Sequence, residues 1–291
     1  GNFSLSSPNI SGERLKNRLI KSRFIVKAYN LLPYDVVNVG MNEVTGGLDF
    51  MKYIKKTARK YEPISANIID SKSQKPFFKP YYVKKVGGKK VGVIGLSSNP
   101  GKKLPGIEIK DPIETLNENI VQLEFIKKVD FVVLLAALNQ KDYERLKEVK
   151  IPVDLALMAL HRGRGRYLTE IQGKIIARAG TEGKYIGMVS AKVKDFDKNL
   201  SDISRSAYKK SFIEGRLKSY ERSAGDKSLD EYFADKPSAR RLYNNMLNNR
   251  NKLEKEIESA VNPVDFKLIP VELTIPKKPD VQAAINEFEN K

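Results

Sequence analysis

The sequence contains no cysteine and only one histidine among its 291 residues. Without cysteine, this chain can form no disulfide, thiolate nucleophile, cysteine-ligated zinc site, iron–sulfur cluster or covalent c-type haem attachment. No apolar run reaches the roughly 18–20 residues that a membrane-spanning helix needs, and the first residues show no signal-peptide pattern. Hydrophobic residues make up 41% and charged residues 30% of the chain, which is typical of a globular protein.

Acidic residues are scarce in the first third of the chain. Residues 1–111 carry 21 Lys and Arg against 8 Asp and Glu, so this third holds most of the formal charge of +18. Such an excess favours an anionic ligand or partner. The alternative is solvated lysine on strand ends and helix surfaces. Because no nucleic-acid motif with interleaved aromatic residues occurs, nucleic acid is the disfavoured partner.

Buried apolar runs alternate with amphipathic segments over the first 200 residues, which predicts an α/β layered domain. Strands are expected at 36–40, 63–69, 79–85, 90–96, 130–137, 153–159, 174–179 and 185–193, and helices at 13–32, 48–61, 112–127 and 141–147. Residues 201–260 are polar and favour an amphipathic helix or a helical hairpin. A short strand and a closing helix from Asp280 follow. Two domains are therefore expected, 1–200 and a helical extension at 201–291.

Several segments resemble one enzyme family. The stretch from Tyr34 to Leu96 includes YDVVNVGMNEVTGG, SANI and KPYYVKKVGGKKVGVIGL, and residues 176–187 read IARAGTEGKYIG. These segments are similar to the 5′-nucleotidase/UDP-sugar hydrolase branch of the calcineurin-like metallophosphatases. The resemblance covers about two-thirds of the chain. It implies a four-layer αββα sandwich of two mixed sheets and an extracytoplasmic location.

The resemblance also implies where metal ligands would lie, and this chain departs from the family there. Active members hold two cations that generate a hydroxide nucleophile. Asn2 stands where a bridging carboxylate is expected, Met41 where a ligand asparagine is expected, and Asn42 where the catalytic histidine is expected. A thioether is a poor ligand for hard divalent ions. A slip of one residue would restore Asn42 as a ligand, so this block alone leaves two alternatives open.

Two further blocks depart in the same way. Ala136 and Ala137 replace a Ser-His strand end, and Leu160 and Arg162 occupy the two histidine positions of a Gly-His-x-His block. His161 lies between them, where a surface or capping role is favoured over a ligand role. The family's Asp-x-His block does not occur, and truncation of a first βα unit upstream of Gly1 would account for that. The sequence therefore predicts no metal, no other cofactor and no catalytic residue.

A basic segment overlaps the block that corresponds to Gly-His-x-His. Arg162, Arg164 and Arg166 alternate with glycine, and three guanidinium groups on a tight loop can hold a phosphate or carboxylate. An anion or partner contact is therefore one hypothesis for these arginines. The alternatives are an exposed loop, or arginines that pair with Glu43 or Asp154.

The leading hypothesis is a non-catalytic, metallophosphatase-like scaffold or interaction protein. The ending NPVDFKLIPVELTIPKKPDV resembles exported relatives that occur with multihaem c-type cytochromes, which implies such a cytochrome as a protein partner. The second hypothesis is a residual metal-dependent 5′-nucleotidase or phosphoesterase. The third is a module that binds an anion or nucleic acid through the basic first third. Whether the chain is an enzyme stays open, although the lost ligands argue against it.

Overall fold

The computed structural model describes residues 11–150, 153–160, 168–180, 184–272, 274–276 and 278–289. The chain divides into two compact units, one of residues 1–187 with 268–291 and one of residues 188–267. None of the described helices is long and apolar enough to cross a bilayer. The domain boundary expected near residue 200 stays a prediction.

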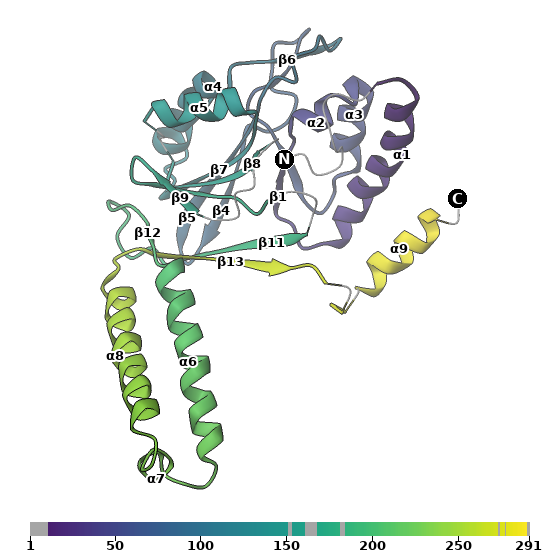
Figure 1. Cartoon of the computed structure of the whole chain (residues 1–291). Helices are drawn as coiled ribbons and strands as arrows, with labels where there is room; N and C mark the ends of the chain where they lie inside the picture. Colours follow the sequence, from purple (N-terminus) through teal and green to yellow (C-terminus); the bar gives the residue numbers. More distant parts are fainter. Residues whose placement is uncertain are drawn as a thin grey trace. The chain divides into compact units, whose positions relative to one another are not determined.

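The centre of the first unit is a six-stranded mixed sheet (Figure 1). In spatial order its strands are β4 (Tyr81–Val86), β5 (Lys89–Ser97), β7 (Phe131–Leu138), β8 (Leu155–Leu160), β10 (Lys174–Ala177) and β9 (Leu168–Ile171). The four inner strands run parallel, and β4 and β9 pair antiparallel at the edges. The inner strands are the continuous apolar runs of the sequence, as expected for a sheet that is covered on both faces. Gly87 and Gly88, both with positive φ, close the predicted β4–β5 hairpin.

Four short strands form a second layer. β1 (Val36–Asn38) pairs parallel with β2 (Glu62–Ile64), and β3 (Ile68–Asp70) pairs antiparallel with β6 (Ile107–Ile109). This layer packs closely on the large sheet, since a Cβ atom on Gly95 of β5 would lie 2.5 Å from Asn38 Oδ1. Only glycine allows this approach.

The single strand predicted at 63–69 is wrong, because the chain is interrupted between β2 and β3. There Ala66 N donates to Gly95 O at 2.7 Å. The side chain of Asn67 donates to Ser97 O and accepts from Ser97 N. These bonds to β5 take the place of ladder bonds, so the chain leaves β2 and joins a different pair of strands.

Helices cover both outer faces and complete four layers (Figure 1). On the side of the short strands lie α1 (Gly12–Ala28), the 3-10 turn η1 (Tyr29–Leu31), α2 (Met41–Val44) and α3 (Gly47–Thr57). On the other side lie α4 (Pro112–Val121), its π-helical continuation η2 (Gln122–Ile126) and α5 (Gln140–Glu148). One core, including Phe50 and Ile68, lies under the first group. The other, including Leu116 and Leu134, lies under the second. The predicted αββα sandwich is confirmed.

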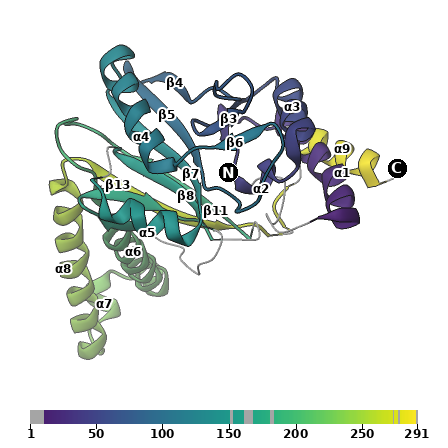
Figure 2. The same ribbon diagram turned by 90° about the horizontal axis from the view of Figure 1, so that it is seen from above.

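The C-terminal helix returns to the first unit. α9 (Pro279–Glu289) lies beside α1, where the rings of Phe288 and Phe24 stack with centroids 4.6 Å apart (Figure 2). The closing helix predicted from Asp280 is therefore present, and it packs on the first helix of the chain.

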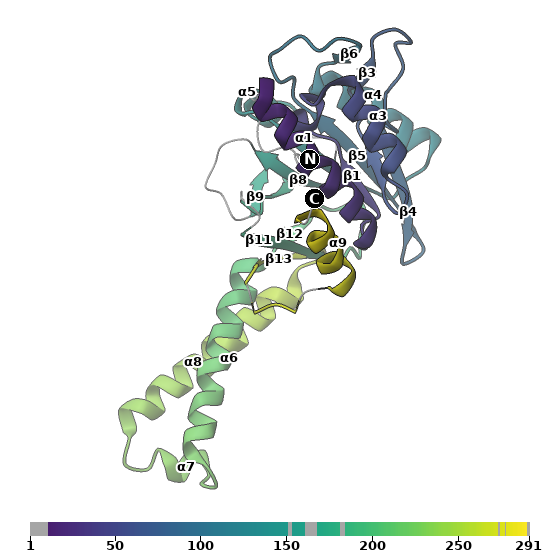
Figure 3. The same ribbon diagram turned by 90° about the vertical axis from the view of Figure 1, so that its right-hand side faces the viewer.

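The second unit is built on a helical hairpin (Figure 3). Its helices are α6 (Ser204–Ala224), α7 (Leu229–Tyr232) and α8 (Pro237–Ser259). They enclose a small core of Ile213, Leu217, Phe233, Tyr243 and Leu253. A three-stranded sheet of order β11-β13-β12 accompanies the hairpin, with β11 (Tyr185–Ala191), β12 (Ser201–Asp202) and β13 (Pro263–Pro270). The hairpin is one of the two arrangements that the sequence allowed.

Candidate functional site

The carboxyl ends of β1, β7 and β8 are where the resemblance places most of the metal ligands, and β5 pairs with β7 in the same sheet. β1 packs against β5 and β7. Ser97, Ala137 and Ala159 are register partners across β5, β7 and β8. The fold therefore gathers the altered motif positions of these strands at one edge of the unit.

The turn after β1 is closed and buried. Gly40 N donates to the Glu43 carboxylate at 3.1 Å, and Val44 N donates to Gly40 O, so Glu43 caps the short helix α2. Met41 and Asn42 are each only 3% exposed and Glu43 is fully buried. The carboxylate that looked available in the sequence thus serves as a helix cap, and Met41 packs as an apolar core side chain.

β7 ends in side chains that offer no ligand atom. Ala136 and Ala137 are both buried, and Ala137 has no exposed surface at all. Its backbone carbonyl accepts a hydrogen bond from Ser98 N. Leu160 closes β8 as register partner of Leu138. Asn2, His161, Arg162, Arg164 and Arg166 lie outside the described residues.

These donors do not fit a two-metal centre. A thioether, an amide and a methyl group replace the imidazole and carboxylate groups that hold two close cations. Among the residues that the structure describes, no group of three or more His, Asp or Glu side chains could hold a metal ion. Asp154, which the sequence offered as a partner for the arginine loop, accepts from Val132 N and lies 3.9 Å from Lys174 Nζ. Because the arginines lie outside the described residues, that pairing stays a prediction.

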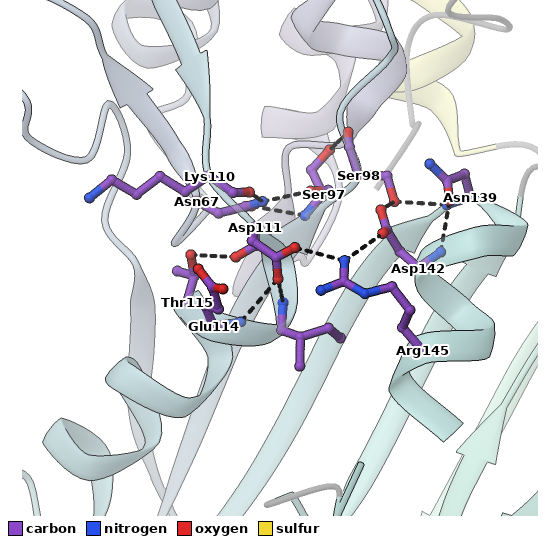
Figure 4. Close-up of polar contacts among 11 residues, drawn as sticks. Asn67, Ser97, Ser98, Lys110, Asp111, Glu114, Thr115, Asn139, Asp142 and Arg145 are labelled. Atoms are coloured by element: carbon purple, nitrogen blue, oxygen red, sulfur yellow. Dashed lines mark hydrogen bonds and ion pairs between the residues drawn. The ribbon is translucent and has the colours of Figure 1, made fainter. Parts of the chain in front are cut away.

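A polar network that the sequence did not reveal lies at the same edge (Figure 4). Ser98 Oγ donates to Asp142 at 2.5 Å and accepts from Asn139 N. Arg145 donates to Asp142 at 3.2 Å and to Asp111 at 2.7 Å. The network connects the end of β5 to the first turns of α4 and α5.

Helix capping explains most of this network. Asp111 accepts from Ile113 N and Glu114 N at the start of α4, and Asn139 accepts from Asp142 N at the start of α5. The sequence pattern Asp-Pro before a helical segment could have identified the first cap. Nothing in the sequence indicates that Ser98 and Arg145 meet the same carboxylate.

Electrostatics agree with a structural role for the network. Burial alone would raise the pKa of Asp111, but hydrogen bonds from Arg145 and from two backbone amides outweigh it and lower this pKa. Arg145 in turn has a raised pKa, mainly through its hydrogen bond to Asp111. A carboxylate held ionised in this way stabilises the fold and is a poor proton donor or acceptor near neutral pH.

The fold is of the class seen in calcineurin-like metallophosphatases, and parts of the sequence are similar to known 5′-nucleotidases. The chain matches no protein-family model. It is 30% identical over 151 residues to a 5′-nucleotidase of Vibrio vulnificus, covering 50% of this chain and 26% of that protein. It is 41% identical over 76 residues to a 2′,3′-cyclic-nucleotide 2′-phosphodiesterase/3′-nucleotidase of Salmonella typhimurium, covering 26% of this chain and 11% of that protein.

Solved structures show the same fold. A putative 5′-nucleotidase from Staphylococcus aureus in complex with alpha-ketoglutarate aligns with a TM-score of 0.58 and 17% identity, over 100% of this chain and 48% of that one. This match shows the fold, and the sequence match to a 5′-nucleotidase confirms the resemblance. The chain spans about a quarter or less of the curated relatives it matches.

Proposed function

We propose that this chain is a non-catalytic, metallophosphatase-like scaffold or interaction protein. The observation that carries the proposal is Ala137, a fully buried methyl group at the carboxyl end of β7 where the resemblance expects a histidine ligand. Met41 is buried at a second ligand position. A hydroxide nucleophile held between two cations requires several imidazole and carboxylate ligands at this edge, and these side chains supply none.

The proposal includes a protein partner and an extracytoplasmic location. The excess positive charge of residues 1–111 supports a partner with an acidic surface. A multihaem c-type cytochrome is the candidate that the resemblance of the ending suggests. Part of that ending has a structural task, since the Asn262 side chain accepts from Lys194 N and donates to Lys198 O. Its resemblance therefore supports the fold more strongly than it supports the cytochrome.

Metal content and turnover test the proposal together. Purified protein should contain substoichiometric Mn, Zn and Fe by elemental analysis. With added Mn²⁺ it should hydrolyse 5′-AMP and bis(p-nitrophenyl) phosphate no faster than the Asn42→Ala variant. Stoichiometric metal together with turnover that Asn42→Ala abolishes would contradict the proposal. Purification of the protein from its native source under non-denaturing conditions tests the partner, because it identifies the proteins that stay bound to this chain.

The second candidate is a residual metal-dependent 5′-nucleotidase or phosphoesterase. The sequence similarity to 5′-nucleotidases and to a cyclic phosphodiesterase favours it. This activity would need ligands from beyond the described residues or from a partner. The turnover assay therefore decides between the two candidates, and it should be repeated on any complex that is purified natively.

A further inference from the structure

A pocket lies in the first unit, away from the altered metal positions. It has a volume of about 600 Å³ and is formed by the end of α3, the start of β2 and residues 75–80. Buried Tyr61, Pro63, Phe77 and Phe78 line it together with the exposed cationic side chains Lys55, Arg59, Lys75 and Lys79. Five of the twelve lining residues are charged, four of them cationic, so the pocket combines apolar side chains with a net positive charge. Apolar side chains with placed polar groups are typical of a small-molecule site.

The direction of the strands separates this pocket from the candidate metal positions. β1 and β2 run parallel, with Val36 beside Glu62. Glu62 begins β2 and lines the pocket, whereas Met41 and Asn42 follow the carboxyl end of β1. The pocket therefore belongs to the amino edge of these strands and the altered metal positions to the carboxyl edge, so this inference does not depend on the proposed function.

The charges around the pocket are only partly neutralised. Lys79 Nζ forms an ion pair with Glu62 at 2.6 Å. Lys55 Nζ donates to Phe77 O at 2.9 Å and lies 5.4 Å from the centroid of the Phe77 ring. Within the described part of the chain, the side chains of Arg59 and Lys75 form no hydrogen bond or ion pair, so two cations remain available at the pocket.

We infer that this pocket binds a small organic anion that has an aromatic or other apolar body. The buried rings would receive the apolar body, because burying it removes apolar surface from water. Arg59 and Lys75 would bind the carboxylate, sulfonate or phosphate group, and the planar guanidinium fork of Arg59 matches two oxygens of such a group. Lys55 and Lys56 in the last turn of α3 offset the negative end of that helix.

Isothermal titration calorimetry with naphthalene-2-sulfonate at low salt tests this inference on the whole chain. Binding is expected, and Arg59→Gln/Lys75→Gln should weaken it by about tenfold, equivalent to about 1.4 kcal/mol, because the variant removes both cations that would contact the anion. The matched control is Lys102→Gln/Lys103→Gln, which removes the same charge at exposed positions outside the pocket. It should leave the affinity unchanged.

Two further probes separate the parts of the ligand. The uncharged ring 2-naphthol and the ring-free anion sulfate should each bind at least about tenfold more weakly than naphthalene-2-sulfonate. Circular dichroism should show both double variants folded, since neither Arg59 nor Lys75 makes a side-chain bond in the described structure. No binding at millimolar naphthalene-2-sulfonate would overturn the inference. So would equal binding by Arg59→Gln/Lys75→Gln, or an equal loss in the control variant.

Discussion

The carboxylates at the carboxyl ends of the sheet strands, here called the carboxyl edge, and those at the amino ends, called the amino edge, lie in opposite electrostatic environments. At the carboxyl edge, Asp111 and Asp142 share Arg145, and Asp111 also caps α4. The pKa of Asp111 is lowered despite burial that acts to raise it. At the amino edge, burial raises the pKa of Asp154 above its ordinary value, against a hydrogen bond from Val132 N and the more distant Lys174. Hydrogen bonds and Arg145 thus stabilise the ionised form of Asp111 at the carboxyl edge, whereas the ionised form of Asp154 at the amino edge is poorly compensated.

Among the described residues, the difference also concerns which end of the strands lines a cavity. Open α/β sheets generally bind ligands outside the carboxyl ends of their strands. Here the side chains of Ser98, Asp142 and Arg145 at that edge all have protein partners (Figure 4). Asp154 instead lines a cavity of about 620 Å³ together with Lys150, Lys174 and Glu124. Within the described part of the chain, these polar side chains at the carboxyl ends of the strands are therefore bonded within the fold, whereas a poorly compensated charge lies at the amino end of β8.

The largest expected effect comes from restoring a ligand at the closed edge. Ala137→His should lower the free energy of unfolding by about 3 kcal/mol, because an imidazole must displace packed neighbours at a fully buried site and bury a polar ring. Urea denaturation measures this loss. Ala234→His, at an exposed position, is the control and should change stability by less than about 0.5 kcal/mol. A stable Ala137→His variant that binds stoichiometric Zn²⁺ would show that the edge is open.

Much of the fold could be predicted because apolar periodicity reports burial directly. The continuous runs that became β5, β7 and β8 were recognisable, and so was the Gly87-Gly88 hairpin. The break between β2 and β3 was not, because it depends on Asn67 binding the backbone of Ser97, 30 residues away in the chain. Side-chain bonds to distant backbone leave no periodic signal.

The candidate site was predictable only as a set of altered positions. The motif spacing located Met41, Asn42 and Ala137, and the structure shows that these side chains are buried. The sequence could not reveal that Glu43 caps its own helix or that Ser98, Asp142 and Arg145 meet. The contact between Ser98 and Asp142 depends on tertiary structure, because it joins residues 44 positions apart, whereas the Glu43 cap is a local contact over three positions.

An intermediate effect is expected from breaking the network itself. Asp142→Ala removes the acceptor of the buried Ser98 hydroxyl and one partner of Arg145, and it should cost about 2 kcal/mol of unfolding free energy. Glu144→Ala, on the same helix, removes an exposed partner of Lys147 and should cost less than about 0.5 kcal/mol. Equal losses of unfolding free energy in the two variants would mean that the network does not stabilise the protein more than an exposed ion pair does.

The smallest effect is a contrast in pH dependence between the two edges. The pKa of Asp111 is lowered in the folded state, so its stabilisation is present above the unfolded pKa of about 3.9 and is lost as the pH falls through the folded pKa. The pKa of Asp154 is raised, so its favourable contribution is present below the unfolded pKa and is lost as the pH rises through the folded pKa.

The two asparagine variants should therefore show opposite slopes. Measured by urea denaturation between pH 3 and pH 7, Asp111→Asn should become less stable relative to the unsubstituted protein as the pH rises. Asp154→Asn should become relatively more stable, because asparagine retains an oxygen that can accept from Val132 N without burying a charge. Each difference should stay within about 1 kcal/mol. Parallel slopes would show that the two edges treat their carboxylates alike, and the distinction between a closed and an uncommitted edge would fail.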